Sequence, residues 1–180
     1  SLHKSQHNLC CVVTATDKKQ GRGLKVVNSP VKNYCLKNTI KVIQPENFNS
    51  QEFLNEIIGY KPDIIVVVAF KILPKKLWEI PKLGTINVNA SILPNLRGAA
   101  PINWAIINGL KKTGLTSFFI NEGVDTGDII KIKEIKINED DNFGSLYEKL
   151  RSLSGNFILD TIDEIQKVNG KPQVNTKDLL

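Results

Sequence analysis

The 180-residue sequence is poor in the residues that build metal sites and disulfides, with two histidines, three cysteines and no methionine. Both histidines, His3 and His7, lie in a polar N-terminal stretch, so a histidine-based metal site or catalytic triad is not expected there. Cys10 and Cys11 are adjacent and would point to opposite faces of a strand, and no cysteine spacing matches a metal motif. We therefore expect reduced, packed cysteines and no bound metal.

Long apolar runs and export signals are also missing. No stretch approaches the roughly eighteen apolar residues that a membrane span needs, and residues 1–8 are polar instead of charged and then apolar. The sequence therefore predicts a soluble, cytoplasmic protein that does not contact a membrane. A content of 41% hydrophobic residues is enough for one core, and the chain is too short for two ordinary domains.

Basic residues exceed acidic ones, which gives a formal net charge of +6 and a sequence pI of about 9.2. Such a charge favours an anionic partner, because lysine and arginine attract phosphates without sequence recognition. The basic residues bunch in residues 18–25, 71–76 and 111–112. Each cluster could equally be a solvated surface, so charge alone does not identify the partner.

Alternating strand and helix patterns predict an α/β fold. Strands are expected in residues 8–14, 39–44, 62–70, 84–88, 114–121 and 127–137. Helices are expected from the Ser29-Pro30 pair onward and in residues 49–58, 101–108 and 144–168. Continuously apolar strands indicate an open, mostly parallel, doubly wound (Rossmann-like) sheet, and the alternation slips near Glu134, as in an edge strand with a bulge.

In open α/β sheets ligands bind beyond the carboxyl ends of strands, which directs attention to residues 87–102 and 122–128. Asn87 and Asn89 are two apart on a strand, so both amides face one side and can donate to one oxygen. A pair of asparagines that bonds only to loop backbone remains the alternative. Asp125, in a tight turn, could place its carboxylate against this loop.

Taken in order, these motifs resemble the folate-dependent formyltransferases, whose pattern is a strand ending N-x-H, then S-L-L-P, then an acidic D-x-G loop. The corresponding segments are N-V-N at 87–89, S-I-L-P at 91–94 and V-D-T-G-D at 124–128. The segments R-G-A-A-P-I at 97–102 and G-R-G-x-K at 21–25, just before S-P-V-K at 29–32, resemble methionyl-tRNA formyltransferases in particular. The resemblance runs from about residue 8 to the final tail.

This resemblance implies a formyltransferase type of sheet from which the first strand, with its Gly-Thr-Pro turn, is missing before Ser1. Residues 1–170 would be the N-terminal catalytic domain, and residues 171–180 would begin a linker to an absent C-terminal domain. The implied reaction transfers the formyl group of 10-formyltetrahydrofolate to the α-amino group of initiator methionyl-tRNA, a one-carbon transfer that serves translation initiation. No metal takes part, and we expect a monomer.

The resemblance also assigns roles to single residues. Asn87 would bind the oxyanion, while Asp125 would orient the neighbouring side chain and move protons through water. The residues implied to line the folate site are Ser91, Ile92, Leu93 and Pro94. The residues implied to contact tRNA are Arg22, Lys25 and Arg97, of which Arg97 could instead cap its own loop.

Asn89 stands where the family has its catalytic histidine. Asparagine keeps a neutral donor but cannot titrate, and it would leave Asp125 without its histidine partner. General acid–base catalysis typically contributes about 10²- to 10⁴-fold, so the sequence predicts a slow or inactive enzyme. Three functions stay open: an impaired tRNA formyltransferase, a relative acting on an amino sugar or a purine-precursor amine, and a catalytically dead remnant that binds folate or RNA.

Overall fold

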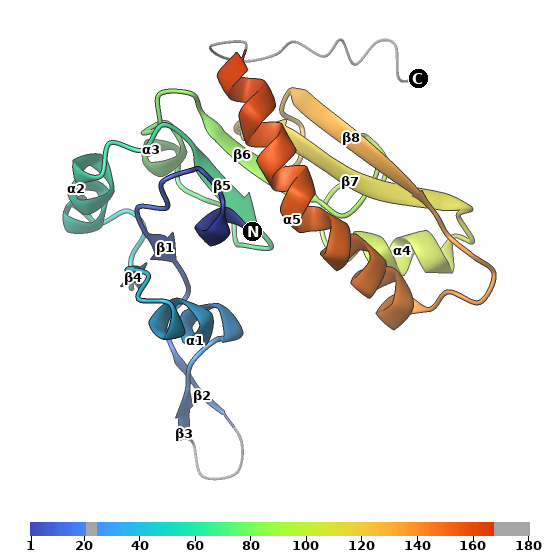
Figure 1. Cartoon of the computed structure of the whole chain (residues 1–180), viewed down its shortest axis with the longest axis horizontal. Coiled ribbons are helices and arrows are strands. Elements are labelled where there is room, and N and C mark those ends of the chain that lie inside the picture. Colours follow the sequence, from blue (N-terminus) through green and yellow to red (C-terminus); the bar gives the residue numbers. More distant parts are fainter. Residues whose placement is uncertain (21–24, 168–180) are drawn as a thin grey trace. The chain divides into compact units, whose positions relative to one another are not determined.

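The computed structural model describes residues 1–20 and 25–167. The chain divides into two compact units, a N-terminal unit of residues 2–62 and a C-terminal unit made of Ser1 and the chain from Asp63 onward. The N-terminal unit holds two two-stranded sheets, and the C-terminal unit holds one sheet of four strands (Figure 1). Within the described residues, no helix has the length and apolar character needed to cross a membrane.

The N-terminal unit is built around a short parallel pair of strands, β1 and β4. Its elements in chain order are η1 (Leu2–Lys4), β1 (Val12–Val13), β2 (Lys18–Gln20), β3 (Lys25–Val27), α1 (Pro30–Lys37), β4 (Val42–Ile43) and α2 (Gln51–Gly59). Ser29 caps α1, because its hydroxyl accepts a hydrogen bond from the backbone N of Lys32 at 3.1 Å. Ser50 caps α2 in the same way. Both helices were predicted from the sequence and are confirmed, whereas β1 and β4 are shorter than predicted.

A charged network braces the segment that leads into the antiparallel β2–β3 hairpin. Lys32, on α1, forms an ion pair with Asp17 and donates to Oε1 of Gln44 at 2.6 Å. Gln44 in turn donates to the backbone oxygen of Ala15 at 2.7 Å. The hydrogen bonds from Lys32 and Gln44 lower the pKa of the Asp17 carboxyl. The network therefore joins α1 to the ends of β1 and β4.

The C-terminal unit is a four-stranded sheet in the order β5-β6-β7-β8. Its elements are β5 (Ile65–Val68), α3 (Lys75–Trp78), β6 (Thr85–Asn89), α4 (Pro101–Ile107), β7 (Lys112–Phe119), β8 (Ile129–Lys136) and α5 (Phe143–Lys167). Helix α5 packs along β7 and β8, and α4 lies beside the N-terminal half of α5 (Figure 1). Ile86, Leu146 and Ile165 are completely buried and form part of the core.

The α/β class and the open sheet predicted from the sequence are confirmed. The pairs β1–β4 and β5–β6 are parallel, as predicted, and β7 and β8 add two antiparallel pairs. Strand β8 is an edge of its sheet, also as predicted.

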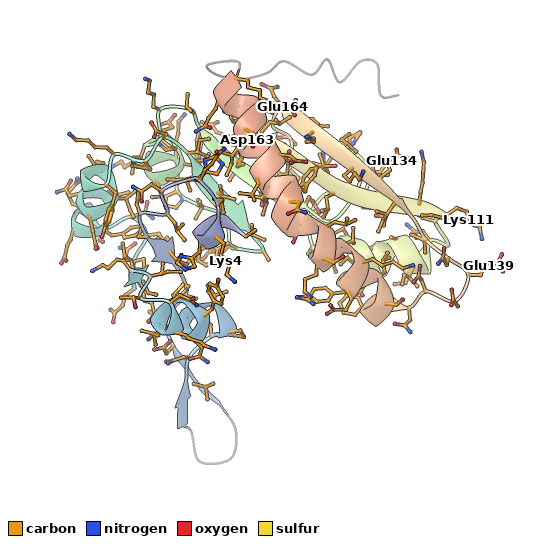
Figure 2. All side chains as sticks on the ribbon, viewed as in Figure 1. Lys4, Lys111, Glu134, Glu139, Asp163 and Glu164 are labelled. Atoms are coloured by element: carbon orange, nitrogen blue, oxygen red, sulfur yellow. The ribbon has the colours of Figure 1, made fainter. Side chains whose placement is uncertain are left out.

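The bulge in β8 lies at a different residue from the one predicted. Glu134, labelled on β8 in Figure 2, pairs regularly with Gly114. The register shifts instead between the partners of Ser117 and Phe118, which leaves Ile130 as the additional residue. The extra residue lets Ile129 and Ile130 both be buried although they are adjacent, which a regular strand does not allow.

The carboxylate of Asp141 secures the start of α5. Its side chain is only 4% exposed and accepts hydrogen bonds from Nζ of Lys149 at 2.6 Å, the backbone N of Asn138 at 2.8 Å and Oγ of Ser145 at 2.7 Å. The bond from Lys149, followed by those from Asn138 and Ser145, lowers the pKa of Asp141 from 3.8 to about 2. The charged form of this carboxylate is therefore favoured in the folded chain.

We expect Asp141→Asn to lower the melting temperature at neutral pH. Because the pKa of Asp141 is lower in the folded state, its stabilising effect is complete above about pH 4 and is lost as the pH falls toward 2. The difference in unfolding free energy between the variant and the parent chain should therefore shrink over that range. Urea melts at a series of pH values measure it, with exposed Asp140→Asn as the control. A difference that stays constant down to pH 2 would contradict the assignment.

Candidate active site

Two loops meet at the carboxyl end of β6, one following Asn89 and the other joining β7 to β8. Asn89 ends β6 and is 7% exposed, and its Nδ2 donates to Oδ2 of Asp125 at 2.7 Å. The backbone N of Gly98 donates to the same oxygen at 2.8 Å. The structure thus brings the carboxylate of Asp125 against the first loop. Its other oxygen, Oδ1, has no hydrogen-bond partner within residues 1–20 and 25–167.

Asn87 lies on the same face of β6 as Asn89, and its amide has a fixed orientation. Its Oδ1 accepts a hydrogen bond from the backbone N of Val88 at 2.8 Å, so the nitrogen of the amide points the other way. In the part of the chain that the structure describes, no acceptor faces this Nδ2. The oxygen of Asn87 thus bonds to the backbone of its own strand and not to a loop, while its nitrogen remains available as a donor to a ligand.

Asn89 provides Asp125 with a neutral partner at the position that the resemblance gives to a histidine. The amide nitrogen carries two hydrogens, of which one is used by Asp125 and one remains. An amide neither takes up nor releases a proton near neutral pH, so this pair can orient groups but cannot relay protons through Asn89. The arrangement supports oxyanion stabilisation better than it supports general acid–base catalysis.

Thr116 of β7 fixes the S-I-L-P loop through hydrogen bonds to its backbone. Thr116 donates from Oγ1 to the backbone oxygen of Ser91 at 2.7 Å and accepts from the backbone N of Leu93 at 3.1 Å. Ser91 and Leu93 are buried, whereas Ile92 and Pro94 are half-buried and can contact a ligand directly. Sequence reasoning missed Thr116, although its place opposite Asn89 in the sheet register makes it the natural support.

The Leu93-Pro94 peptide bond is cis, and the Ser91 hydroxyl is fully buried without a hydrogen-bond partner among the described residues. Leu93 packs against Phe118 and Ile129 of the sheet. Of the four residues of this loop, Ser91 and Leu93 are therefore the buried ones that anchor it to the sheet, and Ile92 and Pro94 remain partly exposed.

The loop of residues 120–128 is held at several points. Inside the loop, Oδ1 of Asn121 accepts from Oγ1 of Thr126 at 2.8 Å and from the backbone N of Gly123 at 3.0 Å. Lys75, at the start of α3, binds Glu122 at 2.6 Å, and this hydrogen bond raises the pKa of Lys75 and lowers that of Glu122. Lys75 is therefore already paired with an acid of the chain on the exposed surface, which lowers the net positive charge of the cluster at 71–76.

The structure describes the residues expected to contact tRNA in different detail. Arg97 is exposed, and its Nε donates to the backbone oxygen of Asp125 at 2.9 Å. Lys25 belongs to β3 through its backbone, and Arg22 lies outside the described residues. Among the residues described, no group of three or more histidine, cysteine, aspartate or glutamate side chains could hold a metal ion.

Comparison with known proteins decides which family these loops belong to. The sequence model of the Formyl transferase family matches residues 1–162. The chain belongs to this formyltransferase family. It is 47% identical to the methionyl-tRNA formyltransferase of Flavobacterium psychrophilum over 166 residues, and the aligned region covers 92% of this chain and 52% of that protein. Against the methionyl-tRNA formyltransferase of Clostridioides difficile it is 46% identical over 168 residues, or 93% of this chain and 54% of that one.

The chain thus spans about half the length of the curated relatives it matches. Solved structures of formyltransferases share its fold. A phosphoribosylglycinamide formyltransferase from Bacillus halodurans superposes with a TM-score of 0.67 and 24% identity, covering 89% of this chain and 81% of that one. A sugar N-formyltransferase from a Shewanella species superposes with a TM-score of 0.64 and 23% sequence identity, covering 79% of this chain and 55% of that one. At this identity the two structures establish the formyltransferase fold and not the amine that is formylated.

Proposed function

We propose that this chain transfers the formyl group of 10-formyltetrahydrofolate to the α-amino group of initiator methionyl-tRNA. The observation that carries the proposal is the hydrogen bond between Asn89 and Asp125 at the end of β6, in a strand that also carries Asn87 on the same face. The curated relatives of this formyltransferase, at 46–47% identity, are named methionyl-tRNA formyltransferases. The reaction would serve translation initiation in the cytoplasm, with the chain acting as a monomer and without a metal. Residues 1–170 would form the catalytic domain, with a linker beyond them.

The geometry suggests a role for each group in the reaction. The substrate amine attacks the formyl carbon, and the carbonyl oxygen becomes a tetrahedral oxyanion. The free Nδ2 of Asn87 donates to that oxyanion, which is the interaction that strengthens most in the transition state. Asp125 has Oδ2 fixed by two donors and Oδ1 open, so Oδ1 accepts the proton that the amine loses, through water. The folate nitrogen that loses the formyl group gains a proton.

Folate and tRNA would be bound by different sets of residues. Ser91, Ile92, Leu93 and Pro94 form the folate loop, in which the half-buried Ile92 and Pro94 offer an apolar surface suited to a flat ring. The tRNA-binding residues of the proposal are Arg22, Lys25 and Arg97, which position the acceptor end through its phosphates. The net charge of +6 supports an anionic substrate.

The competing functions differ in the amine that receives the formyl group. The test supplies 10-formyltetrahydrofolate with methionyl-tRNA, glycinamide ribonucleotide or an amino-sugar nucleotide, using both the parent chain and its Asn89→His variant. We expect formyl transfer to methionyl-tRNA alone. Formylation of another amine would reassign the substrate. Folate binding without transfer by either protein would instead support a catalytically dead binding protein.

A further inference from the structure

Arg97 has an exposed side chain that is nevertheless bound to the loop of residues 120–128, which carries Asp125. Its Nε donates to the backbone oxygen of Asp125, 28 residues further along the chain, at 2.9 Å. The next residue, Gly98, donates its backbone N to the carboxylate of the same Asp125 at 2.8 Å. Two consecutive residues of one loop therefore hold both the main chain and the side chain of Asp125.

Asp125 needs such support because of its backbone conformation. Its φ angle is 51°, in the left-handed region that favours glycine and that other residues adopt at an energetic cost, which is smaller for aspartate than for most. A residue in this region keeps its conformation only where surrounding contacts fix it. The backbone oxygen of Asp125 is the acceptor for Arg97, so loss of that bond removes a restraint on the strained residue itself. Relaxation of φ would turn the carboxylate away from Asn89.

The choice of arginine fits this arrangement. Nε lies on the stem side of the planar guanidinium, so a bond from Nε fixes the plane while leaving the two terminal nitrogens free. Those nitrogens have no ion-pair partner in residues 1–20 and 25–167. By contrast, Arg151 on α5 uses both Nε and a terminal nitrogen on Glu148. Arg97 is thus bound to a backbone oxygen of the loop of residues 120–128 and not to a carboxylate.

We propose that Arg97 is a positioning residue for formyl transfer, which holds Asp125 in the conformation that faces Asn89. This inference rests on the proposed function. It assigns Arg97 an effect on the rate of the chemical step, beyond any contact of its terminal nitrogens with tRNA. Lysine should not replace it, because a single flexible ammonium lacks the planar geometry of the guanidinium.

The first arm of the test needs no substrate. Amide hydrogen exchange of Gly98, followed by NMR in the 180-residue chain, reports whether Asp125 keeps its place as acceptor. We expect Arg97→Ala to speed this exchange by about tenfold, the equivalent of one ordinary hydrogen bond. Arg151→Ala, which removes an exposed arginine elsewhere in the same unit, should leave it unchanged. Unchanged Gly98 exchange in Arg97→Ala would overturn the proposal.

The second arm separates positioning from tRNA contact. Measured in the Asn89→His background, Arg97→Ala should lower kcat by about 10- to 100-fold, because small misplacements of catalytic groups carry such costs, with KM for the folate unchanged. Arg97→Lys should not restore kcat. An unchanged kcat with a raised KM for tRNA, and a salt dependence of tRNA binding weakened by about one phosphate contact, would mean that Arg97 only contacts tRNA. Absence of transfer in every variant would refute the proposed function and with it the effect of Arg97 on the rate, while the exchange experiment would still decide whether Arg97 holds Asp125 in place.

Discussion

Replacing Asn89 by histidine is expected to raise the rate of formyl transfer by about 10²- to 10⁴-fold, the usual contribution of a general acid–base group. The amide of Asn89 already donates to Asp125 at 2.7 Å, so the carboxylate is in place to orient an imidazole at this position. One ring nitrogen would donate to Asp125, and the other would face the same side of β6 as the free Nδ2 of Asn87. The site would then gain a group that titrates near neutral pH.

Initial rates with saturating 10-formyltetrahydrofolate and methionyl-tRNA measure this effect. Asn95→His is the matched control, because Asn95 lies in the same loop but is exposed and outside the group around Asp125. It should leave the rate of the parent chain unchanged. Asn89→Ala should be slower than the parent chain, because it removes a donor to Asp125. If Asn89→His is no faster than the parent chain, the histidine position has been assigned to the wrong residue.

Much of the fold could be predicted because burial leaves a clear pattern in the sequence. The apolar runs around β5 and β6 and the capped starts of α1 and α2 correspond to elements of the structure. The β2–β3 hairpin was not predicted, because strands of three residues with several lysines show no useful apolar alternation. The direction of β7 was equally hidden, since a period of two residues is the same for parallel and antiparallel strands.

That direction matters for the site. The sequence placed Asp125 beside Asn89 on the premise that both follow the carboxyl ends of parallel strands. Strand β7 is antiparallel to β6, so its end lies near the start of β6, where the backbone N of Ile120 donates to the oxygen of Thr85 at 2.8 Å. The loop of residues 120–128 then folds back to bring Asp125 to Asn89. The two groups meet as predicted, but by a route that the sequence did not indicate.

The residues that hold the site in place could not be predicted from the sequence for a related reason. Thr116 and Arg97 act through bonds to backbone atoms of residues 23 or more positions away, and such partners depend on the packed fold. The motif residues themselves, Asn87, Asn89 and Asp125, could be singled out because their order and spacing resemble the formyltransferase pattern, whereas each one alone is an ordinary strand-end or turn residue. Motifs therefore identified the candidate groups, and only the structure shows which residues hold them.

Gly127→Ala is expected to lower formyl transfer by at least about 10²-fold, measured in the Asn89→His background. A Cβ added to Gly127 would lie 1.6 Å from the backbone oxygen of Phe119, far closer than any real contact. Phe119 ends β7, and its backbone N is bonded to the oxygen of Asp128 at 2.9 Å, so the strand cannot easily give way. The loop must move instead, and Asp125 lies only two residues before the added methyl group. A shift of about 1 Å in a catalytic group can cost about 10²-fold in rate.

The matched control is Gly59→Ala at the end of α2, where an added Cβ meets nothing within 4 Å. Alanine is favoured over glycine in a helix by up to about 1 kcal/mol, so this variant should keep its activity and melt at an equal or higher temperature. Circular dichroism and thermal melts distinguish a displaced loop from a lost fold in Gly127→Ala. If that variant stays folded and turns over normally, the position of Asp125 does not depend on close packing of its loop against β7. If it stays folded but loses activity, while Gly98 exchange also rises, the loop position controls the reaction through Asp125.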